Sequence, residues 1–224
     1  SSPVTNADIT INKLVIEEIQ KNFPDHDILG EEESCRQNNS SYLWVCDPID
    51  GTYNFIHHFP IVTFSLALVH NGQPILGVIF DPFSDELYFA QKDKGAYLND
   101  KQIYVSPSDT LDKNIVELSM SPRGKFDLWP LFKNLSDHGG RVMRLGSTIY
   151  AGGKVASGSF IATIYANIKP HDVAAIKIIV EEAGGKATDL HGNDQRYDQP
   201  IKGLLASNTK THEAIIQEII PLIN

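Results

Sequence analysis

The sequence predicts a layered α/β sandwich, in which sheets and helices pack in alternating layers. Strand-like apolar runs fill much of the first half of the chain, and strand-like and helical segments alternate through the second half. The clearest helix covers residues 172–183, where four apolar residues fall on one stripe before Gly184-Gly185 ends it. Interleaved strands and helices are typical of layered α/β proteins rather than of all-α or all-β ones.

The first half is expected to begin with a helix over residues 8–23, whose apolar side chains recur at helical spacing and which Pro24 ends. Asn71-Gly72 predicts a hairpin between the second and third strands that follow this helix. Those strands are expected at residues 42–46, 62–70, 75–80 and 87–91, with shorter ones within 95–105.

The second half of the chain contains segments with the alternation of a strand and segments with the apolar spacing of a helix. Strands are expected at residues 116–119, 142–145, 160–165 and 204–206, and helices at 126–135, 149–155, 172–183 and 211–220. The stretch 106–112 is rich in Ser, Pro and Asp, and it is the best candidate for the boundary between two halves of the chain. We therefore expect a single unit, residues 1–224, made of two packed halves, 1–109 and 110–224.

Composition argues against several functional classes. The net charge of -9, from 19 basic and 28 acidic residues, disfavours a nucleic-acid-binding or anionic-membrane surface. No apolar run approaches the ~20 residues of a membrane span, and the chain does not begin with a signal-peptide pattern. Cys35 and Cys46 make no disulfide scaffold, so we expect a cytoplasmic protein. Because the chain starts at Ser1 without Met, we expect a native N-terminal segment to be missing from it.

The most informative motif is Asp47-Pro48-Ile49-Asp50-Gly51-Thr52, which follows an expected strand. In open α/β sheets, ligands bind at that end of a strand. A turn at the proline would bring the two carboxylates to one edge, with the isoleucine carbonyl as a third oxygen, and Mg²⁺ prefers such ligands. The last two residues could seat a phosphate group with their backbone N–H groups. The alternative is a solvated Asp-Pro turn that caps the next segment.

Two further acidic features bear on this motif. Glu31-Glu32-Glu33 follows a short apolar run, and at most one or two of these diverging side chains can face a common metal ion. We expect Glu33 to be solvated. Asp172 opens the clearest helix, so it is suited both to an N-cap and to a metal ligand.

Three segments in this order resemble the signatures of the inositol monophosphatase family, one of the Mg²⁺-dependent, Li⁺-sensitive phosphatases. They are Gly30-Glu31-Glu32, the motif at residues 47–52, and His171-Asp172-Val173-Ala174-Ala175. The resemblance covers essentially the whole chain. It implies the αβαβα sandwich of that family's sugar phosphatase fold, a metal-binding half (1–109), a substrate-side half (110–224) and a homodimer. It also implies an additional helix before the start of this chain.

The resemblance further implies a ligand set for two or three Mg²⁺ ions. The first ion would bind Glu31, Asp47 and the Ile49 carbonyl, the second would bind Asp47, Asp50 and Asp172, and a weaker third would lie near Glu31 and Glu32. Ca²⁺ and Li⁺ would inhibit. By the same resemblance, Asp8 would hydrogen-bond Thr52, whose hydroxyl would help Glu31 to orient and deprotonate the attacking water, with no covalent intermediate.

The substrate implied by the resemblance is a small phosphate ester, with inositol 1-phosphate as the leading candidate. The substrate contacts would be Asp50, Gly51, Thr52, Gly146, Ser147, Thr148, Tyr165 and Asp172. Two positions depart from the family pattern: His171 replaces a Trp, and Tyr165 replaces a Glu that contacts substrate hydroxyls. Activity on fructose 1,6-bisphosphate or on the 2′-phosphate of NADP therefore remains an alternative, as does a non-enzymatic regulatory or scaffold role.

Two other interpretations carry less weight. A phosphatase with a covalent aspartyl intermediate has one residue between its two aspartates, whereas two residues separate Asp47 and Asp50 here. His57-His58 could suggest a transition-metal site, but neighbouring side chains face apart, so we expect both to lie at the surface.

Overall fold

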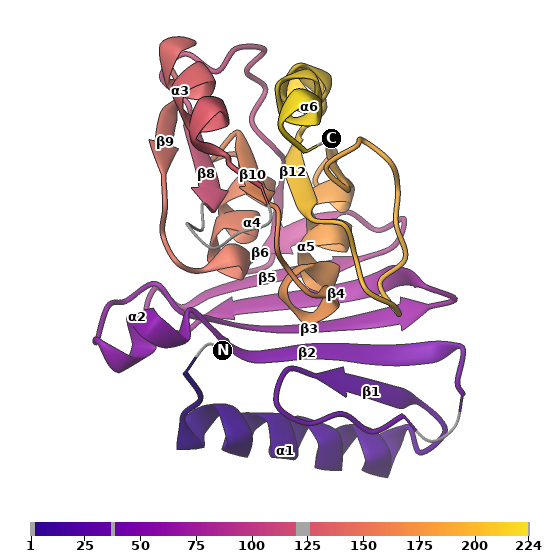
Figure 1. Cartoon of the computed structure of the whole chain (residues 1–224). Coiled ribbons are helices and arrows are strands. Elements are labelled where there is room, and N and C mark those ends of the chain that lie inside the picture. Colours follow the sequence, from indigo (N-terminus) through magenta and orange to yellow (C-terminus); the bar gives the residue numbers. More distant parts are fainter. Residues whose placement is uncertain (1–2, 37–38, 120–125, 224) are drawn as a thin grey trace.

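The computed structural model describes residues 3–36, 39–119 and 126–223, and two sheets alternate in it with helical layers (Figure 1). Helix α1 (Asn6–Asn22) covers the outer face of the first sheet, and α4 (Thr148–Ala156) and α5 (Pro170–Glu182) lie between the two sheets. Helices α3 (Trp129–Asp137) and α6 (Thr209–Ile223) cover the second sheet. The order of layers is αβαβα, so the predicted layered sandwich is confirmed.

The first sheet has seven strands in sequence order. They are β1 (Asp27–Gly30), β2 (Tyr42–Asp50), β3 (Thr63–His70), β4 (Gln73–Asp81), β5 (Glu86–Gln91), β6 (Ala96–Leu98) and β7 (Lys101–Ile103). Strand β1 pairs with β2 in parallel, and every later neighbour is antiparallel. The meander follows from short turns such as the hairpin predicted at Asn71-Gly72, where both residues have positive φ.

The second sheet has the order β11-β12-β10-β8-β9. Its strands are β8 (Ile115–Ser119), β9 (Arg141–Met143), β10 (Ala162–Tyr165), β11 (Gly185–Thr188) and β12 (Leu204–Asn208). Sequence analysis did not predict β1 or β11, which have four residues each. Among the described residues, no helix has the length and the apolar character that crossing a membrane requires.

Helix α5 is buried between the sheets over most of its length. It begins at Pro170, two residues before the predicted start, because a proline is compatible with the first turn of a helix. At its other end, the Glu182 carboxylate accepts hydrogen bonds from the backbone N–H groups of Asp93, Lys94 and Gly95, at 2.8, 3.1 and 2.7 Å. These bonds attach the C-terminal turn of α5 to the loop between β5 and β6.

Helices α4 and α5 approach each other at Gly152. A Cβ atom at this position would lie 2.5 Å from Cγ1 of Ile176, closer than side chains pack. Gly152→Ala is therefore expected to lower the free energy of unfolding by about 1–3 kcal/mol through overpacking, although alanine favours helix formation. Urea denaturation measures this change.

A double-mutant cycle with Ile176→Ala identifies the cause. Removing the isoleucine side chain leaves room for the added methyl group, so the loss in the double variant should be smaller than the sum of the two single losses. Additive losses would show that the helix contact does not produce the effect.

Candidate metal centre

Four of the predicted acidic residues line one cavity of about 180 Å³ at the ends of β1 and β2, whereas the predicted residues Glu32 and Asp8 do not line it. Its lining comes from both halves of the chain: Glu31, Asp47, Ile49, Asp50, Gly51, Thr52, Tyr53, Gly146 and Asp172. The N-termini of α2 (Thr52–Ile56), α4 and α5 lie beside it. Residues distant in sequence therefore form a single site.

Asp47 and Asp50 share the site because strand β2 contains an irregularity. Asp47 pairs with Ser65 and Asp50 with Thr63, so one extra residue on β2 is accommodated as a bulge. In a regular strand, residues three apart face opposite sides of the sheet. The extra residue of the bulge brings the side chains of Asp47 and Asp50 to the same side. The predicted turn at the proline is therefore wrong: the strand continues through Asp50, and the Asp47 carboxylate accepts a hydrogen bond from Ile49 N at 3.0 Å.

Gly51 ends β2 and precedes α2 with a φ of +89°, a conformation that favours glycine. A Cβ atom on Gly51 would lie 2.8 Å from the Ile61 carbonyl oxygen. Glycine is therefore favoured here by its φ and by the close approach of Ile61, and both Gly51 and Thr52 line the cavity. The Thr52 hydroxyl donates to the Ile49 carbonyl at 3.2 Å.

Asp172 completes a cluster with Asp47 and Asp50, in which one oxygen atom from each carboxylate lies within 4.8 Å of the others. Asp172 is the third residue of α5 rather than its N-cap, and its Oδ2 accepts from Lys169 N at 2.7 Å. It therefore stabilises the start of the helix and also reaches the cluster. The predicted N-cap role is therefore wrong, because Lys169 occupies the N-cap position, but Asp172 still accepts a hydrogen bond at the start of the helix while it reaches the cluster.

Burial raises the pKa values of all three carboxyl groups, and repulsion from neighbouring carboxylates raises those of Asp47 and Asp172 further. Burial is the largest cause for each, and it raises the pKa of Asp172 to about 7. Negative charges this close are unfavourable unless a cation lies among them. The donors are all oxygen atoms, and hard divalent cations such as Mg²⁺ or Ca²⁺ prefer oxygen. The cluster therefore fits a divalent metal ion.

Asp50 is held by the start of α4. Its Oδ2 accepts from the Ser147 hydroxyl and, at 2.7 Å, from Ile149 N. Ser147 is also the N-cap of α4, where its hydroxyl accepts from Tyr150 N at 3.3 Å. Ser147 and Thr148 are buried and do not line the cavity, whereas Gly146 does.

The glutamates differ in their surroundings. Burial, followed by the neighbouring Glu32 charge, raises the pKa of Glu31, which lines the cavity. Burial also raises the pKa of Glu32, and the nearby charge of Asp8 adds to this effect. Glu33, His57 and His58 are exposed, as predicted.

The expected hydrogen bond between Asp8 and Thr52 does not form in the described chain. Asp8 directs Oδ2 to the backbone and the hydroxyl of Thr5, in the capping box that starts α1. Its other oxygen, Oδ1, is buried without a hydrogen-bond partner. The Asp8 carboxylate therefore caps helix α1 instead of bonding Thr52. It nevertheless lies close enough to Glu32 for its charge to raise the pKa of that residue.

Tyr165 lies beneath the site and not in the cavity lining. Its hydroxyl oxygen and Oε1 of Glu117 are both buried without a hydrogen-bond partner. Burial, followed by the Glu117 charge, raises the pKa of Tyr165 well above its ordinary value, and burial raises that of Glu117 to about 7. Sequence analysis missed Glu117, although an acidic residue inside the apolar run of β8 was a usable signal.

His171 is buried, and burial lowers its pKa to about 4. It is therefore neutral near pH 7. Its Nε2 lies 3.8 Å from Oδ1 of Asp172.

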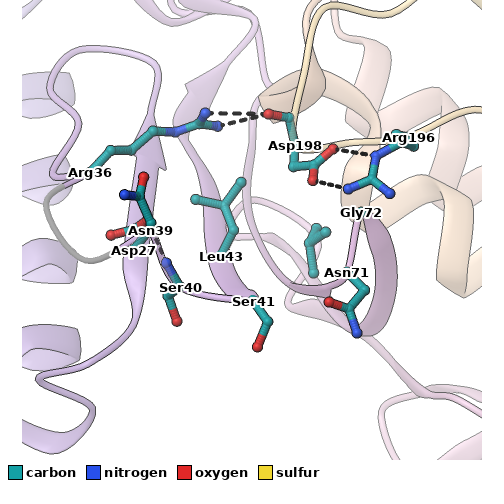
Figure 2. Close-up of a pocket in the computed structure, with 11 residues that line it drawn as sticks. Asp27, Arg36, Asn39, Ser40, Ser41, Leu43, Asn71, Gly72, Arg196 and Asp198 are labelled. Carbon is teal, nitrogen blue, oxygen red and sulfur yellow. Dashed lines mark hydrogen bonds and ion pairs between the residues drawn. The ribbon is translucent and has the colours of Figure 1, made fainter.

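A larger cavity of about 430 Å³ lies at the opposite ends of β2 and β3 (Figure 2). Arg36 and Arg196 approach Asp198 from two sides: Arg36 donates to the backbone carbonyl at 3.2 and 3.3 Å, and Arg196 pairs with the carboxylate. This cavity contains none of the predicted site residues, so the acidic chemistry belongs to the smaller one.

The αβαβα layers and a buried carboxylate cluster that fits a divalent cation are the features expected of a metal-dependent phosphatase. The model described as the inositol monophosphatase family matches residues 1–222, and the chain belongs to that family. Members of the family hydrolyse phosphoric monoesters, so the protein is a phosphatase.

The alignments with two similar proteins cover most of this chain. It is 36% identical to "Nus factor SuhB" of Xylella fastidiosa over 96% of this chain and 81% of that protein. It is 34% identical to "Fructose-1,6-bisphosphatase/inositol-1-monophosphatase" of Aquifex aeolicus, over 96% and 80%.

Solved structures give the same result. SuhB from Bartonella henselae superposes with a TM-score of 0.91 at 28% identity, covering 98% of this chain and 86% of that one. An "IMPase/NADP phosphatase complexed with NADP and Ca2+" gives 0.86 at 28% identity, covering 96% and 83%.

Proposed function

We propose that the protein hydrolyses a small polyol or sugar phosphate in the presence of Mg²⁺, with inositol 1-phosphate as the leading substrate. The observation that carries this proposal is the cluster of Asp47, Asp50 and Asp172, whose oxygen atoms lie within 4.8 Å of one another at a cavity lined by Gly51 and Thr52. Carboxylates placed in this way would hold cations where the phosphate group binds.

The proposed ligands are the oxygen atoms of Glu31, Asp47, Asp50 and Asp172 and the Ile49 carbonyl, with Glu32 contributing to a third, weaker site. A bound divalent cation would neutralise charge on the phosphate group and acidify a water molecule. The stoichiometry of two or three Mg²⁺ ions is part of the proposal. Millimolar Li⁺ and also Ca²⁺ are expected to inhibit.

The protein's own groups would orient the reactants. The backbone N–H groups of Gly51 and Thr52 would bind phosphate oxygens, and the Thr52 hydroxyl would orient the attacking water. Glu31 would accept the proton from this water, because its carboxylate lines the cavity in which the water would bind. Phosphoryl transfer needs mainly positioning and charge neutralisation, so no covalent intermediate is required.

Substrate choice depends on the other half of the chain. Gly146 lines the cavity, and the buried residues Ser147, Thr148 and Tyr165, which do not line it, would contribute to the polyol site. Tyr165 places no carboxylate beside the substrate hydroxyls, so recognition of inositol should rest on fewer polar contacts. Fructose 1,6-bisphosphate and NADP are the alternative substrates, because similar proteins are named for these activities.

A phosphate-release panel with Mg²⁺ tests the proposal, comparing inositol 1-phosphate, fructose 1,6-bisphosphate and NADP. We expect release from at least one substrate, highest for inositol 1-phosphate, and loss of release when EDTA is added. No release from any of the three would favour a regulatory or scaffold role. We further propose that the enzyme acts in the cytoplasm as a homodimer, which sedimentation analysis can check.

A further inference from the structure

Asn54 in α2 connects two segments that border the metal centre. Its Nδ2 donates a hydrogen bond to the Ile61 carbonyl at 2.9 Å and another to the Leu145 carbonyl at 2.9 Å. Ile61 follows α2, whereas Leu145 is 91 residues away and leads into α4. A single half-buried amide therefore links the two halves of the chain beside the cavity.

The space between these segments is closely filled by Asn54. A Cβ atom on Gly146 would lie 3.4 Å from the Asn54 Oδ1 atom. A Cβ atom on Gly51 would lie 3.4 Å from Asn54 Nδ2 and 3.3 Å from the Ser147 Cβ atom. A Cβ atom on either glycine would be in ordinary van der Waals contact with the Asn54 amide, so this amide lies directly beside both backbone segments.

Movement of Leu145 would affect two parts of the site at once. The next residue, Gly146, lines the cavity together with Gly51 and Thr52. The residue after it, Ser147, donates to Asp50. Leu145 is therefore adjacent in the chain both to a residue of the cavity lining and to the residue that holds a carboxylate of the cluster.

We propose that Asn54 is a positioning residue, which holds the loop at Leu145 and Gly146 against the Gly51 backbone and so sets the width of the phosphate-binding space. This inference rests on the proposed function, since it assigns Asn54 a task in that reaction. Asn54 touches neither the phosphate group nor the metal ions in this assignment.

Asn54→Leu is the test variant, because leucine has nearly the same shape but cannot donate to either carbonyl and adds no charge. Asn114→Leu is the matched control: Asn114 Nδ2 also donates to two backbone carbonyls, those of Thr110 and Asp112, at 3.0 and 3.1 Å, away from the cavity. Both variants should lose a similar amount of thermal stability.

Only Asn54→Leu is expected to lower kcat/KM, by about a hundredfold, because a displacement of about 1 Å is enough for such a loss. Most of the change should appear as a higher KM. Asn54→Gln keeps the amide on a longer side chain and should recover part of the activity.

Hydrogen exchange gives a readout that does not depend on turnover. Amide exchange at residues 146–149 should accelerate in Asn54→Leu and stay unchanged in Asn114→Leu. If the wild-type protein hydrolyses no ester, the proposed function fails, and unchanged exchange at residues 146–149 would separately overturn the role of Asn54. Equal losses of kcat/KM in the two leucine variants would also overturn it, because they would indicate a general effect on stability.

Discussion

Replacing Asp50 with asparagine is expected to lower kcat/KM by at least about a thousandfold while the protein remains folded. Asparagine keeps one side-chain oxygen, which can still accept hydrogen bonds from Ser147 and Ile149 N. It removes the negative charge that the cluster with Asp47 and Asp172 provides for a cation. The expected result is thus a loss of metal-dependent chemistry with little loss of structure.

Steady-state phosphate release and circular dichroism measure these two effects. Asp81→Asn is the matched control, since Asp81 is a buried aspartate whose Oδ1 accepts from the backbone N–H groups of Phe83 and Ser84, outside the cavity lining. The control should retain nearly full activity. Substantial activity in Asp50→Asn would contradict the assignment of Asp50 as a metal ligand.

The second large effect is stabilisation by Mg²⁺. At about a hundred times its Kd, the ion should add about 2.7 kcal/mol to the free energy of unfolding and raise Tm by about 5–10 °C relative to the protein in EDTA. The cause is relief of repulsion among buried carboxylates, which exists only in the folded chain. Differential scanning calorimetry in the two buffers measures the shift.

The shift should also grow with pH. Asp172 has a folded-state pKa of about 7 against an ordinary value of 3.8, so the metal-free folded protein binds more protons than the unfolded chain between these values. Its stability therefore falls as pH rises from about 4 to about 7. Mg²⁺ binds the deprotonated carboxylates and offsets this loss, so the Tm difference between Mg²⁺ and EDTA should be larger at pH 8 than at pH 5.

Two comparisons isolate the metal centre in this experiment. Glu117, whose pKa is also about 7, changes the stability by the same amount in both buffers, so its contribution cancels in the Tm difference. Asp50→Asn should lose most of the Mg²⁺-dependent shift at either pH. A shift that is independent of pH, or that persists in this variant, would place the stabilising ion elsewhere.

Much of the fold was readable from the sequence because long periodic segments carry strong signals. Helix α5 was predicted at residues 172–183 from one apolar stripe, and it spans Pro170–Glu182. Strands β1 and β11 were missed because each has four residues and includes a glycine, so neither shows a clear alternation. Their strand character depends on pairing with β2 and β12, which is a tertiary effect.

The arrangement of the site was harder to predict from the sequence than the fold, because it depends on contacts between distant residues. The acidic residues could be picked out as motifs, but the bulge that brings Asp47 and Asp50 together is set by the register with β3. The bond from Ser147 to Asp50 joins residues 97 positions apart, and the link from Asn54 to Leu145 is almost as distant. Contacts of this kind leave no local pattern in a single sequence.

The attachment of Glu182 to the loop between β5 and β6 has a consequence for the opposite end of α5. An α-helix keeps its length because its backbone hydrogen bonds resist stretching, and it rises about 1.5 Å per residue. Asp172 and Glu182 thus lie near opposite ends of one helix, separated by a rise of about 15 Å along its axis. Asp172 in the acidic cluster is therefore connected, through one helix, to a loop that does not line the cavity. Glu182→Ala would remove this attachment, because its carboxylate accepts from backbone N–H groups that side-chain substitutions in the loop would leave in place.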